Sequence, residues 1–225
     1  MAGRKKVTSS GKCNLCGGIF DKGGIAKHLV ACRQKNDAAA SGKRVSPATA
    51  FHLLVEGRYL PEYWMHLEVP TRASLEILDG FLRDVWLECC GHLSAFTIER
   101  ITYSAEPMGE FEDEDMDIPL SEVLRPGLKF QHDYDFGSTT HLVLKVISEE
   151  DSTLKGKAIR VLARNEPPKI PCSKCGQPAE RVCTECLYEG SGWLCKACAR
   201  EHACGTDMLL PVVNSPRVGV CGYMG

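Results

Sequence analysis

The cysteine and histidine residues near the end of the sequence have the types and the spacing of metal ligands. The segment CSKCGQPAERVCTECLYEGSGWLCKACAREHAC covers residues 172–204. Two residues between a pair of cysteines form a tight turn, which lets both sulfurs reach one tetrahedral zinc ion. Eight such ligands predict two four-coordinate zinc sites, formed by the pairs Cys172/Cys175, Cys183/Cys186, Cys195/Cys198 and His202/Cys204.

These four pairs can be combined in two ways. In a cross-braced arrangement the first and third pairs share one zinc ion, and the second and fourth pairs share the other. In a sequential arrangement the first two pairs share an ion. Cys221 is an alternative eighth ligand or a free thiol, but Cys204 is preferred because it lies nearest the other ligands. The pattern resembles the B-box and related cross-braced zinc modules, which implies protein binding more often than nucleic-acid binding.

Clustered thiols could also form disulfides, a redox pair or an iron–sulfur cluster. The chain has 13 cysteines, so an all-disulfide scheme leaves one unpaired. The basic start MAGRKKVTSSGKC lacks the apolar stretch of a secretory signal, and no run of about 18 apolar residues predicts a membrane span. We therefore expect a cytoplasmic protein and prefer zinc, in closed sites with no open position for catalysis. An iron–sulfur cluster, which also uses four thiolates, stays an alternative.

A second ligand pattern lies near the start of the chain. Cys13 and Cys16 are followed after eleven residues by His28 and Cys32. A helix starting near Gly24 would direct both later ligands to one metal, because residues four apart share a helix face. The pattern is similar to a C2H2 zinc finger whose last histidine is a cysteine, a C2HC finger. This raises the expected content to about three zinc ions per chain, with a small finger core of Phe20, Ile25 and Leu29.

The charge of the chain is divided unevenly along its length. Residues 1–46 carry ten Lys/Arg against two Asp/Glu, whereas residues 47–168 carry eleven against twenty-two. The basic part could contact nucleic-acid phosphates. A single finger would bind weakly, because base-reading fingers act in tandem, and the alternatives are a solvated basic face or a protein-docking finger. The candidate phosphate contacts are Arg4, Lys5, Lys6, Lys22, Lys27, Arg33 and Lys35.

Composition divides the chain into a finger (residues 1–35), a flexible linker (36–46), a central domain (47–165), a proline-rich hinge (166–171) and a cysteine-rich module (172–225). In the central domain, hydrophobic patterning predicts strands at 50–59, 63–70, 94–103, 129–136, 140–148 and 157–165. A principal helix is expected over 71–90 with Thr71 as its N-cap, an acidic loop over 106–119 and a short helix over 120–127. This order predicts an α+β domain with one main helix against a mostly antiparallel, β-grasp-like sheet.

The central domain carries a short signature. The segment LSEVLRPGLKFQHDYDFGSTTHLVLKVIS contains Tyr134, Asp135, Phe136, Gly137 and His141. It resembles the plasmid pRiA4b ORF-3-like family, also met as a passenger protein of mobile elements, over about residues 50 to 150. Ser138 stands where that family has aspartate, and Thr139 or Thr140 where it has tryptophan. The resemblance implies a fold and an association with mobile DNA, and it implies no reaction.

The same segment holds the polar residues that could support acid–base or metal chemistry, namely His132, Asp133, Asp135 and His141. A simpler interpretation is a turn, in which Asp135 accepts backbone hydrogen bonds and Gly137 supplies a positive φ. We therefore predict a non-catalytic zinc-binding protein that associates with nucleic acid through its N-terminal finger. The alternatives are a protein-interaction adaptor acting through the C-terminal module and an enzyme using the Asp135/His141 region.

Overall fold

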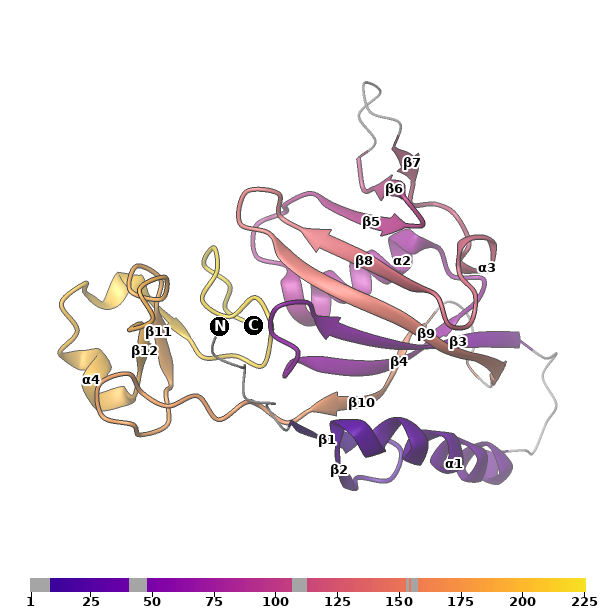
Figure 1. Ribbon diagram of the computed structural model, residues 1–225, viewed down its shortest axis with the longest axis horizontal. Coiled ribbons are helices and arrows are strands. Elements are labelled where there is room, and N and C mark those ends of the chain that lie inside the picture. The colour runs from indigo at the N-terminus through magenta and orange to yellow at the C-terminus, as the bar shows by residue number, and fades with distance from the viewer. Residues whose placement is uncertain (1–8, 41–47, 107–112, 153, 155–157) are drawn as a thin grey trace, which may run out of the picture.

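The strands of the chain form one large sheet and one small sheet (Figure 1). The computed structural model describes residues 9–40, 48–106, 113–152, 154 and 158–225. The large sheet contains β1 (Ser10–Cys13), β2 (Ile19–Asp21), β3 (Ala48–Gly57), β4 (Trp64–Pro70), β5 (Ser94–Ile98), β6 (Ile101–Ser104), β7 (Glu114–Asp115), β8 (Lys129–Tyr134), β9 (Thr140–Ser152) and β10 (Arg160–Asn165). Their order is β2-β1-β10-β4-β3-β9-β8-β5-β6-β7, and every neighbouring pair except β6 and β7 is antiparallel.

The small sheet has the order β12-β11-β13. Its strands are β11 (Arg181–Cys183), β12 (Trp193–Leu194) and β13 (Leu209–Pro211). The helices are α1 (Lys22–Ala40), α2 (Leu75–Leu82), the π-helical turn η1 (Arg83–Leu87), α3 (Leu120–Val123), α4 (Lys196–Arg200) and the 3-10 turn η2 (Thr206–Met208). No helix in the described ranges is long and apolar enough to cross a membrane. The fold is thus α+β and mostly sheet, as the sequence predicts.

Helices α1 and α2 cover opposite faces of the sheet. Successive side chains of a strand point to opposite faces. On one face of β4, Trp64 packs with Ile25 and Leu29 of α1. On the other face, Leu67 packs in the same core as Leu78 of α2. Every residue of β4 is buried for this reason. The prediction of one main helix against the sheet is therefore incomplete, because the helix of the predicted finger, α1, packs against the second face of the sheet.

The larger core lies between α2 and the sheet. It contains the fully buried side chains of Phe51, Trp86 and Phe96, and the C-terminal segment adds Val218. Burying one large apolar side chain completely stabilises a fold by roughly 1.5–3 kcal/mol. This core is large enough to hold the central domain together without a metal ion.

The principal helix starts later than predicted. Its N-cap is Ser74, and its first residue is Leu75. Thr71 instead donates a hydrogen bond from Oγ1 to the backbone carbonyl of Thr49. Residues 71–73 form a turn in which the Ala73 amide donates a hydrogen bond to the Pro70 carbonyl, and Ser74 forms an isolated β-bridge with Pro119. The predicted range 71–90 therefore holds α2 and the turn η1.

The predicted strand 94–103 is a hairpin. Strands β5 and β6 are joined at Glu99 and Arg100, whose φ angles are +48° and +78°. Two-residue turns of this kind usually carry Asn-Gly or Asp-Gly, so the sequence offered no signal for it. Part of the predicted acidic loop, residues 107–112, lies outside the described residues. Beyond it, Met116 is buried and its carbonyl accepts a hydrogen bond from Glu76.

The ends of the chain are joined to the central sheet. Strand β1 pairs with β10, with Gly11 opposite Asn165, so the predicted finger forms an edge of the sheet. Helix α1 continues to Ala40, into the stretch predicted as a flexible linker, because no Gly or Pro interrupts it after residue 24. Figure 1 shows the small sheet projecting beyond the large one, and the last segment of the chain returning to the large sheet.

Candidate metal centres

Four groups of Cys and His side chains each bring their ligand atoms within 4.8 Å of one another. Together they use all 13 cysteines, and none of these is disulfide-bonded. In a tetrahedral zinc site, sulfurs lie ~3.8 Å apart and a sulfur lies ~3.6 Å from a nitrogen. The groups are Cys13/Cys16/His28/Cys32, Cys172/Cys175/Cys195/Cys198, Cys183/Cys186/His202/Cys204 and Cys89/Cys90/His92/Cys221.

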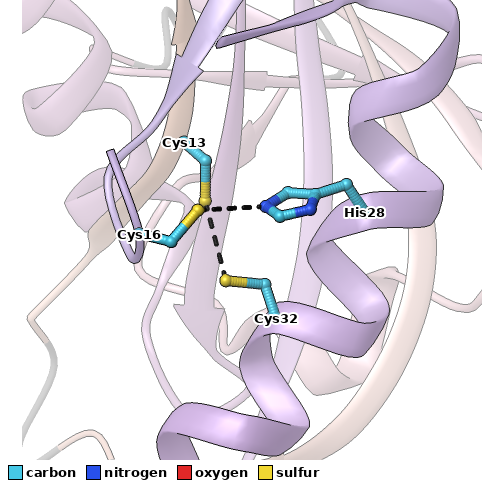
Figure 2. A group of neighbouring side chains, drawn as sticks. All are labelled: Cys13, Cys16, His28 and Cys32. Carbon is cyan, nitrogen blue, oxygen red and sulfur yellow. Dashed lines mark hydrogen bonds between the residues drawn. The ribbon is translucent and has the colours of Figure 1, made fainter. Parts of the chain in front are cut away.

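The first group lies between the β1–β2 hairpin and α1 (Figure 2). Cys13 ends β1, and Cys16 stands in the turn, where Gly17 has a φ of +77°. His28 and Cys32 point to them from successive turns of α1. The Cys13 and Cys32 sulfurs are 3.9 Å apart, and Cys16 Sγ is 3.3 Å from His28 Nε2. The structure thus brings together all four predicted ligands of the finger.

The start of α1 orients the histidine of this group. Asp21 accepts a hydrogen bond from the Gly24 amide at 2.7 Å, so the helix begins at Lys22, slightly before the predicted start. The ring of Phe20 stacks on His28 with centroids 3.8 Å apart. A capping carboxylate and a stacked ring therefore hold His28 with its Nε2 toward the sulfurs.

The thiols of this group have different proton affinities. Burial raises the pKa of Cys32 to about 11, and the neighbouring thiols add to this. The backbone amide of Gly18 lowers the pKa of Cys16. Without a cation, Cys32 would stay protonated at neutral pH. A divalent ion would offset the cost of bringing several thiolates together, which is the chemistry of a zinc site.

The second group holds the first and third Cys-x-x-Cys pairs of the C-terminal module. Cys175 Sγ lies 3.6 Å from Cys195 Sγ and 3.7 Å from Cys198 Sγ. Cys195 is also the N-cap of α4 and accepts a hydrogen bond from the Cys198 amide. Backbone hydrogen bonds, chiefly at Cys195, lower the pKa of Cys172 to about 6, which favours the thiolate that a metal requires.

The third group holds the remaining two pairs. Cys186 Sγ lies 3.6 Å from Cys204 Sγ and 3.5 Å from His202 Nε2. The pairs are therefore grouped in the interleaved order of a cross-brace, and Cys204 occupies the eighth position instead of Cys221. The thiol of Cys204 raises the pKa of Cys186 to about 12, with burial as a further cause. Thiolates confined in one site repel one another until a cation binds.

The hydrophobic core around these two groups is very small. Its buried members are Cys172, Cys183, Leu194, Cys195 and Ala199, so most of them are themselves candidate ligands. A core of this size cannot stabilise a fold by apolar burial alone. Val182 of the small sheet packs in the larger core instead, so metal ions would cross-link the side of the module that carries the ligands.

The fourth group was missed by the sequence analysis. It combines Cys89, Cys90 and His92 with Cys221, although His92 and Cys221 are 129 residues apart. The run CCGH at residues 89–92 is a possible signal for this group, but the apolar spacing predicts that its cysteines end the principal helix. The partner could not be identified from spacing, because only the tertiary fold brings Cys221 to it.

The candidate phosphate contacts of the finger differ in exposure. Lys27 and Lys35 are exposed on α1. Lys22 is half-buried, forms an ion pair with Glu56 and donates a hydrogen bond to the Pro61 carbonyl. Arg4, Lys5 and Lys6 lie outside the described residues.

Arg33 is not available to a ligand. Its side chain is 2% exposed and forms ion pairs with Glu68 at 3.1 Å and Glu150 at 3.2 Å. The sequence alone does not reveal this burial, because the two acidic partners come from β4 and β9, which are distant from Arg33 along the chain. Its assignment as a phosphate contact is therefore wrong.

The candidate acid–base residues do not form one cluster. His132 is buried and lies 2.6 Å from Asp79 Oδ1 of α2. His141 Nδ1 lies 2.7 Å from Asp133 Oδ1. The Asp133 side chain points to the face of β8 opposite to that of His132, because adjacent residues of a strand alternate between the two faces. Asp135 lies beyond the end of that strand. This separation gives no support to a catalytic site built from the four residues.

Asp135 instead organises a turn. Its Oδ1 accepts hydrogen bonds from the amides of Gly137 at 3.0 Å and Ser138 at 3.1 Å, as the turn interpretation predicts. The positive φ, however, is at Asp135 itself, at +65°, and not at Gly137. Around it, Tyr134 is fully buried and Phe136 is 58% exposed.

Comparison with known proteins adds no function. No family model and no curated protein matches this sequence. Among solved structures, the chain is similar to a protein of unknown function, MM3350 from Methanosarcina mazei Go1, with 14% identity and a TM-score of 0.43. That match covers 51% of this chain and 69% of the other. Membership of the pRiA4b ORF-3-like family stays a prediction.

Proposed function

We propose that the protein is a non-catalytic zinc-binding protein, whose metal ions fix small modules that bind a macromolecular partner. The observation that carries this proposal is the donor set of the predicted sites, each of which is a closed group of four Cys or His ligand atoms. Sulfur-rich, four-ligand sets of this kind favour zinc over the oxygen-seeking cations Mg²⁺ and Ca²⁺. They leave no coordination position for a substrate, so the metal has a structural role.

Metal analysis of pairs of variants tests both the metal and the cross-brace. In the cross-braced arrangement, Cys172→Ser/Cys198→Ser removes one zinc ion per chain because both residues belong to one site. Cys172→Ser/Cys186→Ser removes two, since it damages both sites. The sequential arrangement predicts the reverse. Wild-type protein purified without chelator that contains iron or no metal, or that has these thiols in disulfides, would contradict the proposal.

The geometry favours a protein partner bound by the C-terminal module. Tyr188 is 79% exposed, in a turn where the amides of Glu189 and Ser191 donate to the carbonyl of the ligand Cys186. The adjacent Leu187 packs against the larger core. Tyrosine is enriched among the anchor residues of protein interfaces, and a hydrogen-bonded turn limits the backbone entropy that is lost on binding.

Photo-crosslinking tests this partner class. A photoreactive amino acid at position 188 of the zinc-loaded protein should capture one discrete protein, and Tyr188→Ala should abolish its binding. The matched control is position 59, because Tyr59 is 58% exposed on the central domain. Equal capture at both positions, or capture that chelation leaves unchanged, would contradict an adaptor role.

Nucleic-acid association through the finger is the second candidate. Lys27 and Lys35 support it because they are exposed on one helix, whereas Arg33 and Lys22 are already paired. We expect Lys27→Glu/Lys35→Glu to remove about two phosphate contacts from duplex binding. The slope of the logarithm of the binding constant against the logarithm of the salt concentration should then become shallower by roughly 1.8. The exposed Lys129 of β8 offers the control Lys129→Glu. Absence of binding by the wild type at low salt would exclude this candidate.

A further inference from the structure

A fourth group of ligand atoms lies between the central domain and the C-terminal tail, which we define as residues 212–225. Cys89 and Cys90 follow η1 after one residue, His92 precedes β5, and Cys221 belongs to the tail. His92 Nε2 is 2.9 Å from Cys90 Sγ and 3.2 Å from Cys221 Sγ. Cys90 Sγ is 3.7 Å from Cys221 Sγ and 3.5 Å from Cys89 Sγ. These separations are close to those of the three predicted groups.

The tail is held on the central domain by its own contacts. The carbonyl of Asn214 accepts a hydrogen bond from Trp86 Nε1 at 3.1 Å, and Ser215 Oγ donates to the Trp86 carbonyl at 2.6 Å. Val218 and Tyr223 are buried on either side of Cys221. The cysteine is thus presented by an ordered segment.

The backbone at Cys221 is itself unusual. Its φ is +47°, and the flanking Gly219 and Gly222 also have positive φ. Non-glycine residues rarely adopt this conformation, and those that do are often found where a side chain is held for a ligand. Here the conformation directs the Cys221 sulfur toward His92.

A buried charge pair borders the group. Arg217 is fully buried, and its Nη2 lies 2.7 Å from Asp135 Oδ2 and 3.3 Å from Cys89 Sγ. A guanidinium beside a sulfur favours a thiolate over a thiol. A zinc ion with three thiolates and one neutral imidazole has a net charge of about −1, and Asp135 already balances the charge of Arg217, so the arginine acts on the site through its hydrogen bond to the Cys89 sulfur.

The signature residues of the central domain position this arginine. Asp135 binds it directly, and Thr140 Oγ1 accepts a further hydrogen bond from Arg217 Nη1 at 3.0 Å. The Arg217 guanidinium also lies over the ring of Tyr134, 4.8 Å from its centroid, and His92 packs edge-on against the same ring. Residues that hold the neighbours of metal ligands in place also affect the affinity of the site for its metal.

We propose that Cys89, Cys90, His92 and Cys221 bind a fourth zinc ion, which fastens the C-terminal tail to the central domain. Three thiolates and one imidazole form a donor set typical of structural zinc. In this arrangement Tyr134 and Asp135 are positioning residues, because they act on the site through Arg217 and His92. The proposal goes beyond the function proposed above, which requires only the three predicted sites.

Metal stoichiometry tests this site. Wild-type protein should contain four zinc ions per chain, and Cys221→Ser should contain three. Cys90→Ser should also contain three, and the double variant should lose no further ion because both residues belong to one site. Met224→Ser is the matched control, since Met224 is 64% exposed in the same tail and should keep all four ions.

Hydrogen exchange gives a second measurement. The amides of Val218, Val220 and Tyr223 donate hydrogen bonds within the tail. We expect them to exchange roughly tenfold faster or more in Cys221→Ser, because local opening of the tail no longer requires release of a metal ion. The same amides in Met224→Ser should keep the wild-type rates.

Two outcomes would overturn the fourth site. One is a wild-type content of three ions that Cys221→Ser leaves unchanged. The other is a disulfide among Cys89, Cys90 and Cys221 in the native protein, detected by mass spectrometry. Either result leaves the proposed function intact, whereas loss of zinc from the three predicted groups would contradict that function instead.

Discussion

Arg33 of α1 and Glu68 of β4 form a buried ion pair, with Nη2 and Oε1 separated by 3.1 Å and both side chains almost inaccessible to solvent. Glu68 also accepts hydrogen bonds from Ser152 Oγ at 2.8 Å and Arg160 Nε at 2.7 Å. The pair connects the N-terminal metal group to the central sheet. A residue that looked suited to an external ligand therefore has an internal, structural role.

Replacing this arginine should destabilise the protein. We expect Arg33→Ala to lower the free energy of unfolding by about 3 kcal/mol, because breaking a buried pair leaves Glu68 less completely neutralised. Urea unfolding followed by tryptophan fluorescence measures the change. Lys35→Ala on the exposed face of the same helix should stay within about 0.5 kcal/mol of the wild type. Equal effects of the two substitutions would show that the ion pair contributes nothing specific.

Metal removal should act on the two ends of the chain and spare the middle. Chelation should increase hydrogen exchange in α1 and α4, whose small cores include the candidate ligands, and less in β11, whose Val182 packs in the larger core. Strands β3, β4, β8 and β9 should stay protected, because their larger core is held by apolar packing. Adding zinc back should restore the wild-type pattern. Uniform loss of protection over the whole chain would contradict this division.

Acid should destabilise the fold through a buried pair of histidines. His52 Nε2 lies 2.8 Å from His66 Nδ1. Burial lowers the pKa of His52 to about 4 and that of His66 to about 3. In the unfolded chain both would titrate near 6.5, so below this pH the unfolded state binds protons that the folded state does not. Stability is therefore complete above pH 6.5 and is lost as the pH falls toward 4.

The expected loss from His52 alone is about 2 kcal/mol or more between pH 6.5 and 4.5, measured by urea unfolding. The double variant His52→Gln/His66→Gln lacks both imidazoles and should show a shallower dependence on pH. Both proteins carry the same metal groups, so the difference between their curves excludes acid-induced metal loss as its cause. Parallel curves would mean that the two histidines do not control acid stability.

Removing the charge of Asp135 should weaken the fourth site. Asp135→Asn takes away the carboxylate that holds Arg217, and hydrogen bonds from that arginine and two backbone amides outweigh burial to keep the pKa of Asp135 at about 2. We expect zinc affinity at this site to fall roughly 10–100-fold, as measured by competition with a chromophoric chelator. Asp133→Asn is the control, because Asp133 pairs with His141. Equal losses in both variants would contradict a positioning role for Asp135.

Closely spaced ligands were predictable from the sequence, and distant ones were not. The structure gathers all twelve predicted ligands into three groups, because each pair is separated by a single turn of loop or helix. The fourth group depends on the return of the tail to the central domain. No local pattern records that contact, so Cys221 could only be treated as an extra thiol.

The other differences between the predicted and observed structures also come from features that no local sequence pattern records. The succession of strands and helices along the central domain, its main apolar patterns and the α+β class follow from local periodicity. The burial of Arg33 depends on the pairing of β1 with β10, which joins segments from opposite parts of the chain. The β5–β6 hairpin turns at Glu99 and Arg100 without a residue type that favours such a turn. The β-grasp-like layout stays a prediction.

The pairing of β1 with β10 imposes an order on biosynthesis. Gly11 emerges from the ribosome long before its partner Asn165. At roughly 5–20 residues per second, the first strand must wait on the order of 10 s for its place in the sheet. Meanwhile the hairpin and α1 already contain all four ligands of their own metal group. An ion captured at that stage would protect the nascent segment until the partner strand arrives.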